Sequence, residues 1–117
     1  MHKVIIYVKN AVELLIKVFL DDLRKPFKGF ILVKNYKECI ELLKNKKVEA
    51  ISLDHDLGAN KSGYDVALYM VQESIYPKKI YIHSANPVGA QNIYQLLNRY
   101  CPTDVKIYII NYLNGIF

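Results

Sequence analysis

The segment SLDHDLG (residues 52–58) places two carboxylates and an imidazole within three positions, between an apolar run and a glycine. The run that leads into it, AISL (residues 50–53), has the composition of a short strand buried on both faces of a sheet. Asp54, His55 and Asp56 therefore fall where this strand ends. Charged side chains are costly to bury unless partners compensate them. The segment thus indicates the wall of a functional site at the end of a strand.

Short apolar runs alternate along the chain with segments of helical periodicity, which is the pattern of an α/β protein with a mainly parallel sheet. The pattern predicts strands at residues 16–20, 30–33, 50–53, 79–82 and 105–110. It predicts helices at residues 36–45, at residues 64–74, and from residue 87 to a stop at Pro102, with Asn86 as the N-cap of the third helix. We expect a flavodoxin-like three-layer sandwich around a five-stranded sheet.

Parts of the chain depart from this pattern. Residues 22–30 must connect the first two strands, but they contain Pro26 and Gly29, so the first helix is expected to be shortened or missing. Residues 1–15 are an extension that could form a strand, a short helix, or a strand and a turn, and we favour extra structure against the sheet edge. The C-terminal segment NYLNGIF is expected to be a short edge strand or a tail. We treat residues 1–117 as one domain.

Composition and charge limit the kinds of protein that this chain can be. About half of its 117 residues are apolar or aromatic, which suffices for a core without disulfides. Cys39 and Cys101 lack a CxxC spacing, which favours reduced thiols in a cytoplasmic protein. Polar residues interrupt the longest apolar stretch, so neither a membrane span nor a signal peptide is expected.

The formal net charge of +5 favours anionic partners. The lysines are scattered along the sequence or gathered at one helix end, where Lys44, Lys46 and Lys47 lie, and they form no basic stripe. The sequence therefore argues against nucleic acid as a partner and favours a small anionic molecule. It leaves open a protein partner or a homodimer.

Polar side chains collect where the first, third and fourth predicted strands end, and open parallel sheets bind ligands at this edge. If these strands are neighbours, as in a 2-1-3-4-5 order, the side chains meet in one pocket. The residues concerned are Asp21, Asp22, Asp54, His55, Asp56, His83, Ser84 and Asn86.

Several carboxylates in one pocket repel one another and raise one another's pKa unless a cation neutralises them. Mg²⁺ and Mn²⁺ prefer such oxygen ligands and bind phosphates alongside them. We therefore predict that one of these ions binds at a set of four carboxylates: Asp21, Asp22, Asp54 and Asp56. Because strand side chains alternate, Asp54 and Asp56 should share one direction and His55 should point the other way.

Other residues of the pocket suit phosphate chemistry. His83 and His55 are candidate general acids or bases, because an imidazole titrates near neutral pH. Arg24 is a candidate phosphate clamp, and the helix start at Asn86 offers backbone N–H groups to an anion. Each residue also has a purely structural interpretation. The aspartates could cap turns, His83 could be a satisfied core histidine, and Ser84 and Asn86 could cap the following helix.

Four segments together resemble the cyclic-phosphate processing receiver domain family. They are FLDDLRKP (residues 19–26), SLDHDLG (52–58), GYDVALYM (63–70) and HSANPVGAQN (83–92). The resemblance implies a derived receiver fold with an acidic pair after the first strand, an aspartate after the third and a hydroxyl residue after the fourth. The matching positions are Asp21 and Asp22, Asp54 or Asp56, and Ser84.

The resemblance also implies an activity on cyclic phosphates of nucleotides or of ADP-ribose derivatives. We predict His83, His55 and Ser84 as the catalytic residues, and Arg24, Ser84 and Asn86 as the phosphate-binding residues. An ordinary receiver carries a lysine at the end of its fifth strand, but IYIINYLNG offers none and Lys106 lies at the strand's beginning. Our leading hypothesis is a metal-dependent phosphoesterase. The alternatives are a phosphoaccepting receiver in signalling and a module that binds a cyclic nucleotide without cleaving it.

Overall fold

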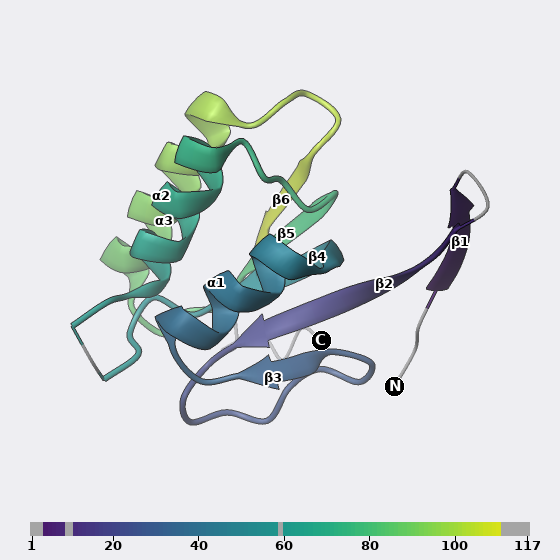
Figure 1. The fold of residues 1–117 in the computed structure, drawn as a ribbon. Coiled ribbons are helices and arrows are strands. Elements are labelled where there is room, and N and C mark those ends of the chain that lie inside the picture. Colours follow the sequence, from purple (N-terminus) through teal and green to yellow (C-terminus); the bar gives the residue numbers. More distant parts are fainter. Residues whose placement is uncertain (1–3, 9–10, 59, 111–117) are drawn as a thin grey trace.

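The computed structural model describes residues 4–8, 11–58 and 60–110. Among these residues the chain forms a six-stranded sheet and three helices (Figure 1). The strands are β1 (Val4–Val8), β2 (Ala11–Leu20), β3 (Ile31–Val33), β4 (Lys47–Leu53), β5 (Lys79–Ile82) and β6 (Lys106–Ile109). The helices are α1 (Tyr36–Asn45), α2 (Gly63–Glu73) and α3 (Pro87–Tyr100). No helix in this part of the chain is long and apolar enough to cross a membrane.

The strand order confirms the predicted topology. Strands β3, β2, β4, β5 and β6 are neighbours in that order and all pair in parallel, which is the 2-1-3-4-5 order of a receiver-like, flavodoxin-like sheet. Helix α1 and strand β5 have the predicted bounds, whereas β2 and β4 begin several residues earlier than predicted. The extra residues of β4, KVE, alternate polar with apolar, and a search for apolar runs overlooks this pattern of a half-exposed strand.

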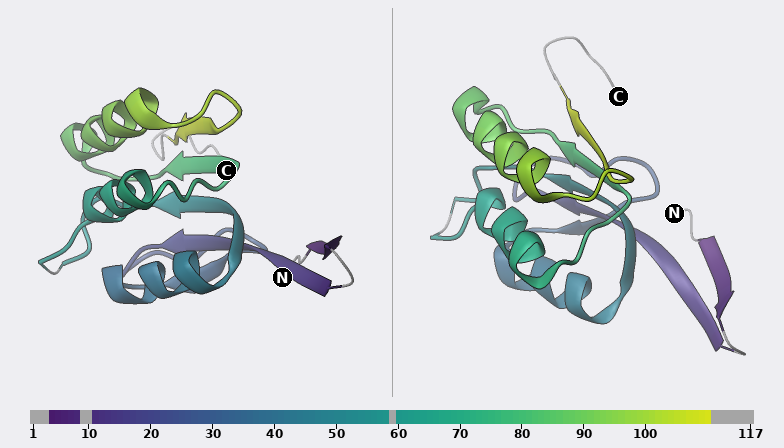
Figure 2. Two further views of the ribbon diagram at one scale, coloured as in Figure 1. Left: turned by 45° about the horizontal axis from the view of Figure 1, so that its top comes forward. Right: turned by 90° about the horizontal axis from the view of Figure 1, so that it is seen from above.

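The three helices lie side by side on one face of the sheet (Figure 2). Side chains at every second strand position, such as Val18, Ile51 and Ile80, form the buried core with them. The other face is covered at the carboxyl ends of the strands by the loop of residues 21–30, where Phe27 packs edge-on against Phe19 with ring centroids 4.5 Å apart. As expected, no helix connects β2 to β3, and the loop of residues 21–30 covers this face of the sheet in place of a helix.

Strand β1 pairs antiparallel with the first half of β2, from Val4 opposite Leu15 to Val8 opposite Ala11. Of the structures that the sequence left open for residues 1–15, the described residues form a strand, β1, against the edge of the sheet, and the short helix is not among them. The predictions for the segment NYLNGIF (residues 111–117) lie outside the described residues.

Caps fix where the helices begin near the carboxyl edge of the sheet. Ser62 and Asp65 form a capping box at the start of α2, and the Asn86 side chain accepts a hydrogen bond from the Gly89 N–H at the start of α3. Gly63 packs directly on the loop after β4, because a Cβ atom there would lie only 1.9 Å from the Asp54 carbonyl oxygen. The start of α2 is therefore locked against the end of β4.

We predict that Gly63→Ala destabilises the fold, because the added methyl group must displace backbone atoms of Asp54. The expected loss is about 1–3 kcal/mol of unfolding free energy, the usual cost of overpacking. Urea denaturation measures it, and the surface substitution Gln72→Ala on the same helix serves as the control. Equal stability of the two variants would contradict the packing described here.

Candidate metal and phosphate site

Asp21, Asp54 and His83 come together at the carboxyl ends of β2, β4 and β5 (the strand ends beside the 21–30 loop in Figure 1). Backbone hydrogen bonds align the three strand ends: the Asp54 N–H donates to the Leu20 carbonyl at 3.1 Å, and the His83 N–H donates to the Leu53 carbonyl at 3.0 Å. One candidate ligand atom from each of the three side chains lies within 4.8 Å of the other two. All three residues are buried. Sequence reasoning predicted this meeting from the strand ends alone.

The carboxylate of Asp21 is held by four hydrogen bonds. Its Oδ1 accepts from the backbone N–H groups of Leu23 at 2.8 Å and Arg24 at 2.9 Å, and its Oδ2 contacts Arg24 Nη1 at 3.1 Å and His83 Nε2 at 3.0 Å. Burial by itself raises the pKa of Asp21, but these hydrogen bonds outweigh burial and hold the pKa below its usual value. Asp21 is therefore ionised in the folded protein at neutral pH.

The His83 ring is buried and fixed on both sides. It stacks on Phe19 with centroids 4.3 Å apart, and its Nδ1 lies 2.6 Å from Ser52 Oγ. Burial lowers the pKa of His83 to about 4, although Asp21 opposes this effect, so the ring is neutral at pH 7. Because an ionised Asp21 can only accept, Nε2 carries the proton and donates it, and Nδ1 accepts from the Ser52 hydroxyl. Both ring nitrogens are thus engaged within the protein.

Asp54 has the opposite electrostatic character to Asp21. Burial and the neighbouring Asp21 charge raise the pKa of Asp54 to about 6, while Arg24 and the hydrogen bond from the Ser84 side chain partly oppose them. Arg24 Nη1 lies 3.6 Å from Asp54 Oδ2 and also contacts Asp21. The Arg24 guanidinium therefore supplies positive charge to both carboxylates.

The donor set fits a hard divalent cation. Two carboxylates and an imidazole lie close enough to share one ion, and hard cations favour carboxylate oxygens. The neighbouring Asp22 supplies a further observation: its Oδ1 is buried and has no hydrogen-bond partner among the described residues. Such an oxygen is costly to bury unless something binds it.

His55 and Asp56 lie apart from this group. His55 Nδ1 contacts Asp56 Oδ1 at 2.7 Å, and Asp56 is mostly exposed and also accepts from the Asn86 side chain at 3.4 Å. The His55 ring packs on the start of α3, where a Cβ at Gly89 would lie 2.4 Å from its Cγ. The strand ends at Leu53, so strand alternation does not govern His55 and Asp56, whose side chains contact each other. Neither Asp22 nor Asp56 belongs to the three-residue group.

Ser84 and Asn86 link the pocket to α3. The Asn86 N–H donates to Ser84 Oγ at 3.0 Å, and the Asn86 side chain caps the helix. Their structural interpretation as capping residues is thus correct, and it coexists with the Ser84 contact to Asp54. The N-terminus of a helix carries a partial positive charge that favours anions, although here Pro87 has no N–H and the Gly89 N–H already donates to the Asn86 side chain.

Sequence reasoning missed Ser52, which orients His83, and the rings of Phe19 and Phe27, which enclose it. Ser52 stands between the apolar residues Ile51 and Leu53 of β4 and is itself buried. A polar residue at a core strand position needs a partner. That requirement was a signal available in the sequence, whereas the aromatic enclosure depends on the path of the loop.

The strand order and the acidic pocket at the strand ends define a receiver-like α/β domain. The family model for the cyclic-phosphate processing receiver domain matches residues 16–99, so the chain belongs to this family. Neither the comparison with curated proteins nor the comparison with solved structures gave a significant match.

We predict that Asp54→Asn stabilises the protein at pH 7 but not at pH 4. The folded state keeps a proton on Asp54 up to about pH 6, whereas an aspartate carboxyl in the unfolded chain has a pKa of 3.8. The unfolding free energy therefore falls as pH rises from about 4 to about 6, and the variant lacks this fall. The expected gain at pH 7 is at most about 3 kcal/mol, measured by urea denaturation at both pH values.

The comparison between the variant and the parent isolates Asp54. His83, whose pKa is lowered to about 4, contributes the opposite trend, since its stabilisation is lost as pH falls from about 6.5 through about 4. Both proteins share this contribution. Asp104→Asn, at an exposed site, is the control and should show no gain at pH 7. An equal gain in unfolding free energy for Asp54→Asn at pH 4 and at pH 7 would show that the pKa of Asp54 is not raised in the folded state.

Proposed function

We propose that this domain is a metal-dependent phosphoesterase that acts on a small cyclic phosphate, such as a cyclic nucleotide or an ADP-ribose derivative. The observation that carries the proposal is the buried group of Asp21, Asp54 and His83, whose ligand atoms lie within 4.8 Å of one another at the carboxyl edge of the sheet. A protein does not bury two carboxylates side by side for stability, because each disfavours the charge of the other.

Asp21 and Asp54 would hold a Mg²⁺ or Mn²⁺ ion. Asp22 lies outside the group of three, and we propose it as a further ligand because its buried Oδ1 has no hydrogen-bond partner among the described residues. When bound there, the ion supplies positive charge for the phosphate and lowers the pKa of a water molecule. Arg24, which already contacts both carboxylates, is suited to nonbridging phosphate oxygens, and the start of α3 at Asn86 adds backbone N–H groups.

His83 is the proposed acid–base group, on one condition. Its Nε2 donates to Asp21, so proton exchange with a substrate requires that this hydrogen bond open. Until then His83 orients Asp21, and Ser52 orients His83. Asp56 was predicted as a metal ligand and His55 as a catalytic group. We now propose that both lie at the rim, where they contact each other and Asp56 contacts Asn86.

A domain that binds a cyclic phosphate without cleaving it is the second candidate. The observation in its favour is the engagement of both His83 ring nitrogens inside the protein. A phosphoaccepting receiver finds less support. An ordinary receiver needs a lysine at the carboxyl end of this strand, but the lysine that residues 106–110 contain, Lys106, lies at the amino end of β6, at the opposite edge of the sheet from Asp54. Incubation with acetyl phosphate and Mg²⁺ followed by mass analysis tests for the phosphorylated aspartate.

The metal prediction is tested by thermal unfolding. Mg²⁺ or Mn²⁺ should raise the Tm of the parent protein, and EDTA should reverse the rise, because the ion binds the folded state alone. Asp21→Asn and Asp54→Asn should abolish the rise, while Asp104→Asn, far from the pocket, should keep it. A rise that survives in both pocket variants would place the metal elsewhere.

The catalytic prediction is tested by product analysis with cyclic nucleotides and cyclic phosphorylated ADP-ribose compounds in the presence of each metal. His83→Ala should lower turnover by about two to four orders of magnitude, which is the usual contribution of acid–base catalysis. Ser52→Ala, which leaves the imidazole in place but removes its hydrogen bond, should have a smaller effect. Substrate binding without any product would support the second candidate and exclude hydrolysis.

A further inference from the structure

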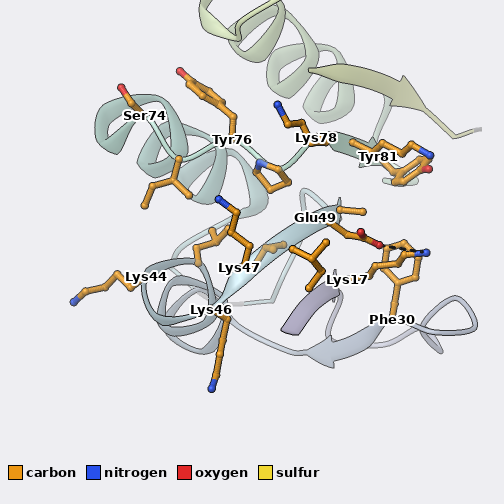
Figure 3. A pocket seen from close by; sticks show the side chains of 17 residues that line it. Lys17, Phe30, Lys44, Lys46, Lys47, Glu49, Ser74, Tyr76, Lys78 and Tyr81 are labelled. Atoms are coloured by element: carbon orange, nitrogen blue, oxygen red, sulfur yellow. Dashed lines mark ion pairs between the residues drawn. The ribbon is translucent and has the colours of Figure 1, made fainter. Parts of the chain in front are cut away.

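A second cavity lies at the opposite edge of the sheet from the acidic pocket. It is a groove of about 750 Å³ at the amino ends of β4 and β5, beside the last turns of α1 and α2 (Figure 3). Lys47, at the far end of the groove, lies about 23 Å of strand from Asp54 at ~3.3 Å per residue, whereas Tyr81, at the near end, lies two residues or about 7 Å of strand from His83. The groove has an apolar floor that includes Leu43, Val48 and Ile75.

Lysines from three separate segments line this groove: Lys17, Lys44, Lys46, Lys47, Lys78 and Lys79. Two of their charges are offset, since Lys17 pairs with Glu49 and Lys78 with Asp104. The carbonyl ends of α1 and α2 remove about one further charge, at roughly half a charge each. An excess of about three positive charges remains, so the lysines exceed what is needed to neutralise the helix ends.

Aromatic rings continue from one end of the groove onto the sheet face that carries no helix. Phe30 and Tyr81 line the groove, and Lys17 lies over the Phe30 ring, 5.8 Å from its centroid. Tyr81 stacks on Tyr108 with centroids 5.2 Å apart and an angle of 20° between the rings. Tyr108 is 42% exposed, so a ring surface remains accessible to a ligand beside the positive groove.

These features together select among anionic partners. A second copy of the chain would bring like charges together if it used the same surface. The carboxylate side chains of an acidic peptide would match the lysines, but they have no planar ring to stack on Tyr108, whereas every nucleotide carries both a phosphate and a base. A single-stranded nucleic acid offers both phosphates for the lysines and bases for the aromatic rings, and this combination is typical of proteins that bind single strands.

We propose that this lysine groove, together with Tyr81 and Tyr108, binds single-stranded nucleic acid. The sequence argued against such a partner because the lysines are scattered along the chain. The fold reverses this expectation, since β2, the end of α1 with the start of β4, and the segment before β5 bring their lysines to one groove.

Fluorescence anisotropy with a labelled twelve-nucleotide oligothymidylate and the full chain tests the proposal. Affinity should fall with rising salt, with a slope of about −0.7 in log K against log salt for each phosphate neutralised. The double variant Lys46→Ala/Lys47→Ala should reduce this slope by up to about 1.4 and weaken binding. Lys34→Ala/Lys37→Ala removes the same charge from exposed positions beside the start of α1, and it should bind nearly as the parent does.

A second pair of variants tests stacking. Tyr108→Ala should weaken binding about 5- to 150-fold, the range for losing one base–aromatic stack, whereas Tyr108→Phe keeps the ring and should bind like the parent. The Mg²⁺-dependent rise in Tm should persist in all of these variants, which shows that they fold and separates this site from the acidic pocket.

Several outcomes would overturn the proposal. One is no anisotropy change at about 50 mM salt, and another is equal weakening by the two lysine pairs. Polyglutamate binding as tightly as the oligonucleotide, with Tyr108→Ala unchanged, would instead assign the groove to acidic polypeptides.

Discussion

The buried carboxylate of Asp21 is the group on which the acidic pocket depends. Its two oxygens hold the turn of Leu23 and Arg24 on one side and the ring of His83 on the other. This arrangement explains how the chain manages without a first helix. The side chain of Asp21 anchors the loop that replaces the helix, and the loop then delivers Arg24 to the carboxylates and Phe27 to the face of β2. The local structure of the loop and the electrostatics of the pocket thus share one cause.

The strand order, the three helices and the meeting of Asp21, Asp54 and His83 could be predicted from the sequence. The reason is physical: periodicity identifies elements, parallel sheets align their carboxyl ends, and alternation sends residues two apart to the same side. These rules hold only while the strand continues. Beyond Leu53 the backbone leaves the strand, so Asp56 turns outward although alternation grouped it with Asp54.

Contacts made by irregular segments could not be predicted. The ion pairs of Arg24 depend on the turn that Asp21 anchors, and the enclosure of His83 depends on where the loop places Phe27. The lysine groove was missed for a related reason, because its charges come from several segments that no local window of sequence contains. Sequence patterns depend on residues that are close together along the chain, whereas a pocket at a sheet edge is formed by residues from several different strands and loops.

The two edges of the sheet carry opposite charge, and the two sets of charges differ in how much they lower the free energy of unfolding. The lysines at the amino edge are mostly exposed, so water screens their repulsion and their cost to stability is small. Asp54 at the carboxyl edge is buried, and the rise of its pKa to about 6 means that folding is opposed by its charge at neutral pH. Arg24 offsets this opposition only in part, because the same guanidinium also contacts Asp21. A ligand that supplies positive charge at this point would relieve the remaining cost, and a domain whose only requirement was stability would gain by replacing Asp54 with a neutral residue. This unrelieved cost at Asp54 is the physical ground for the proposal that the carboxyl group binds a cation.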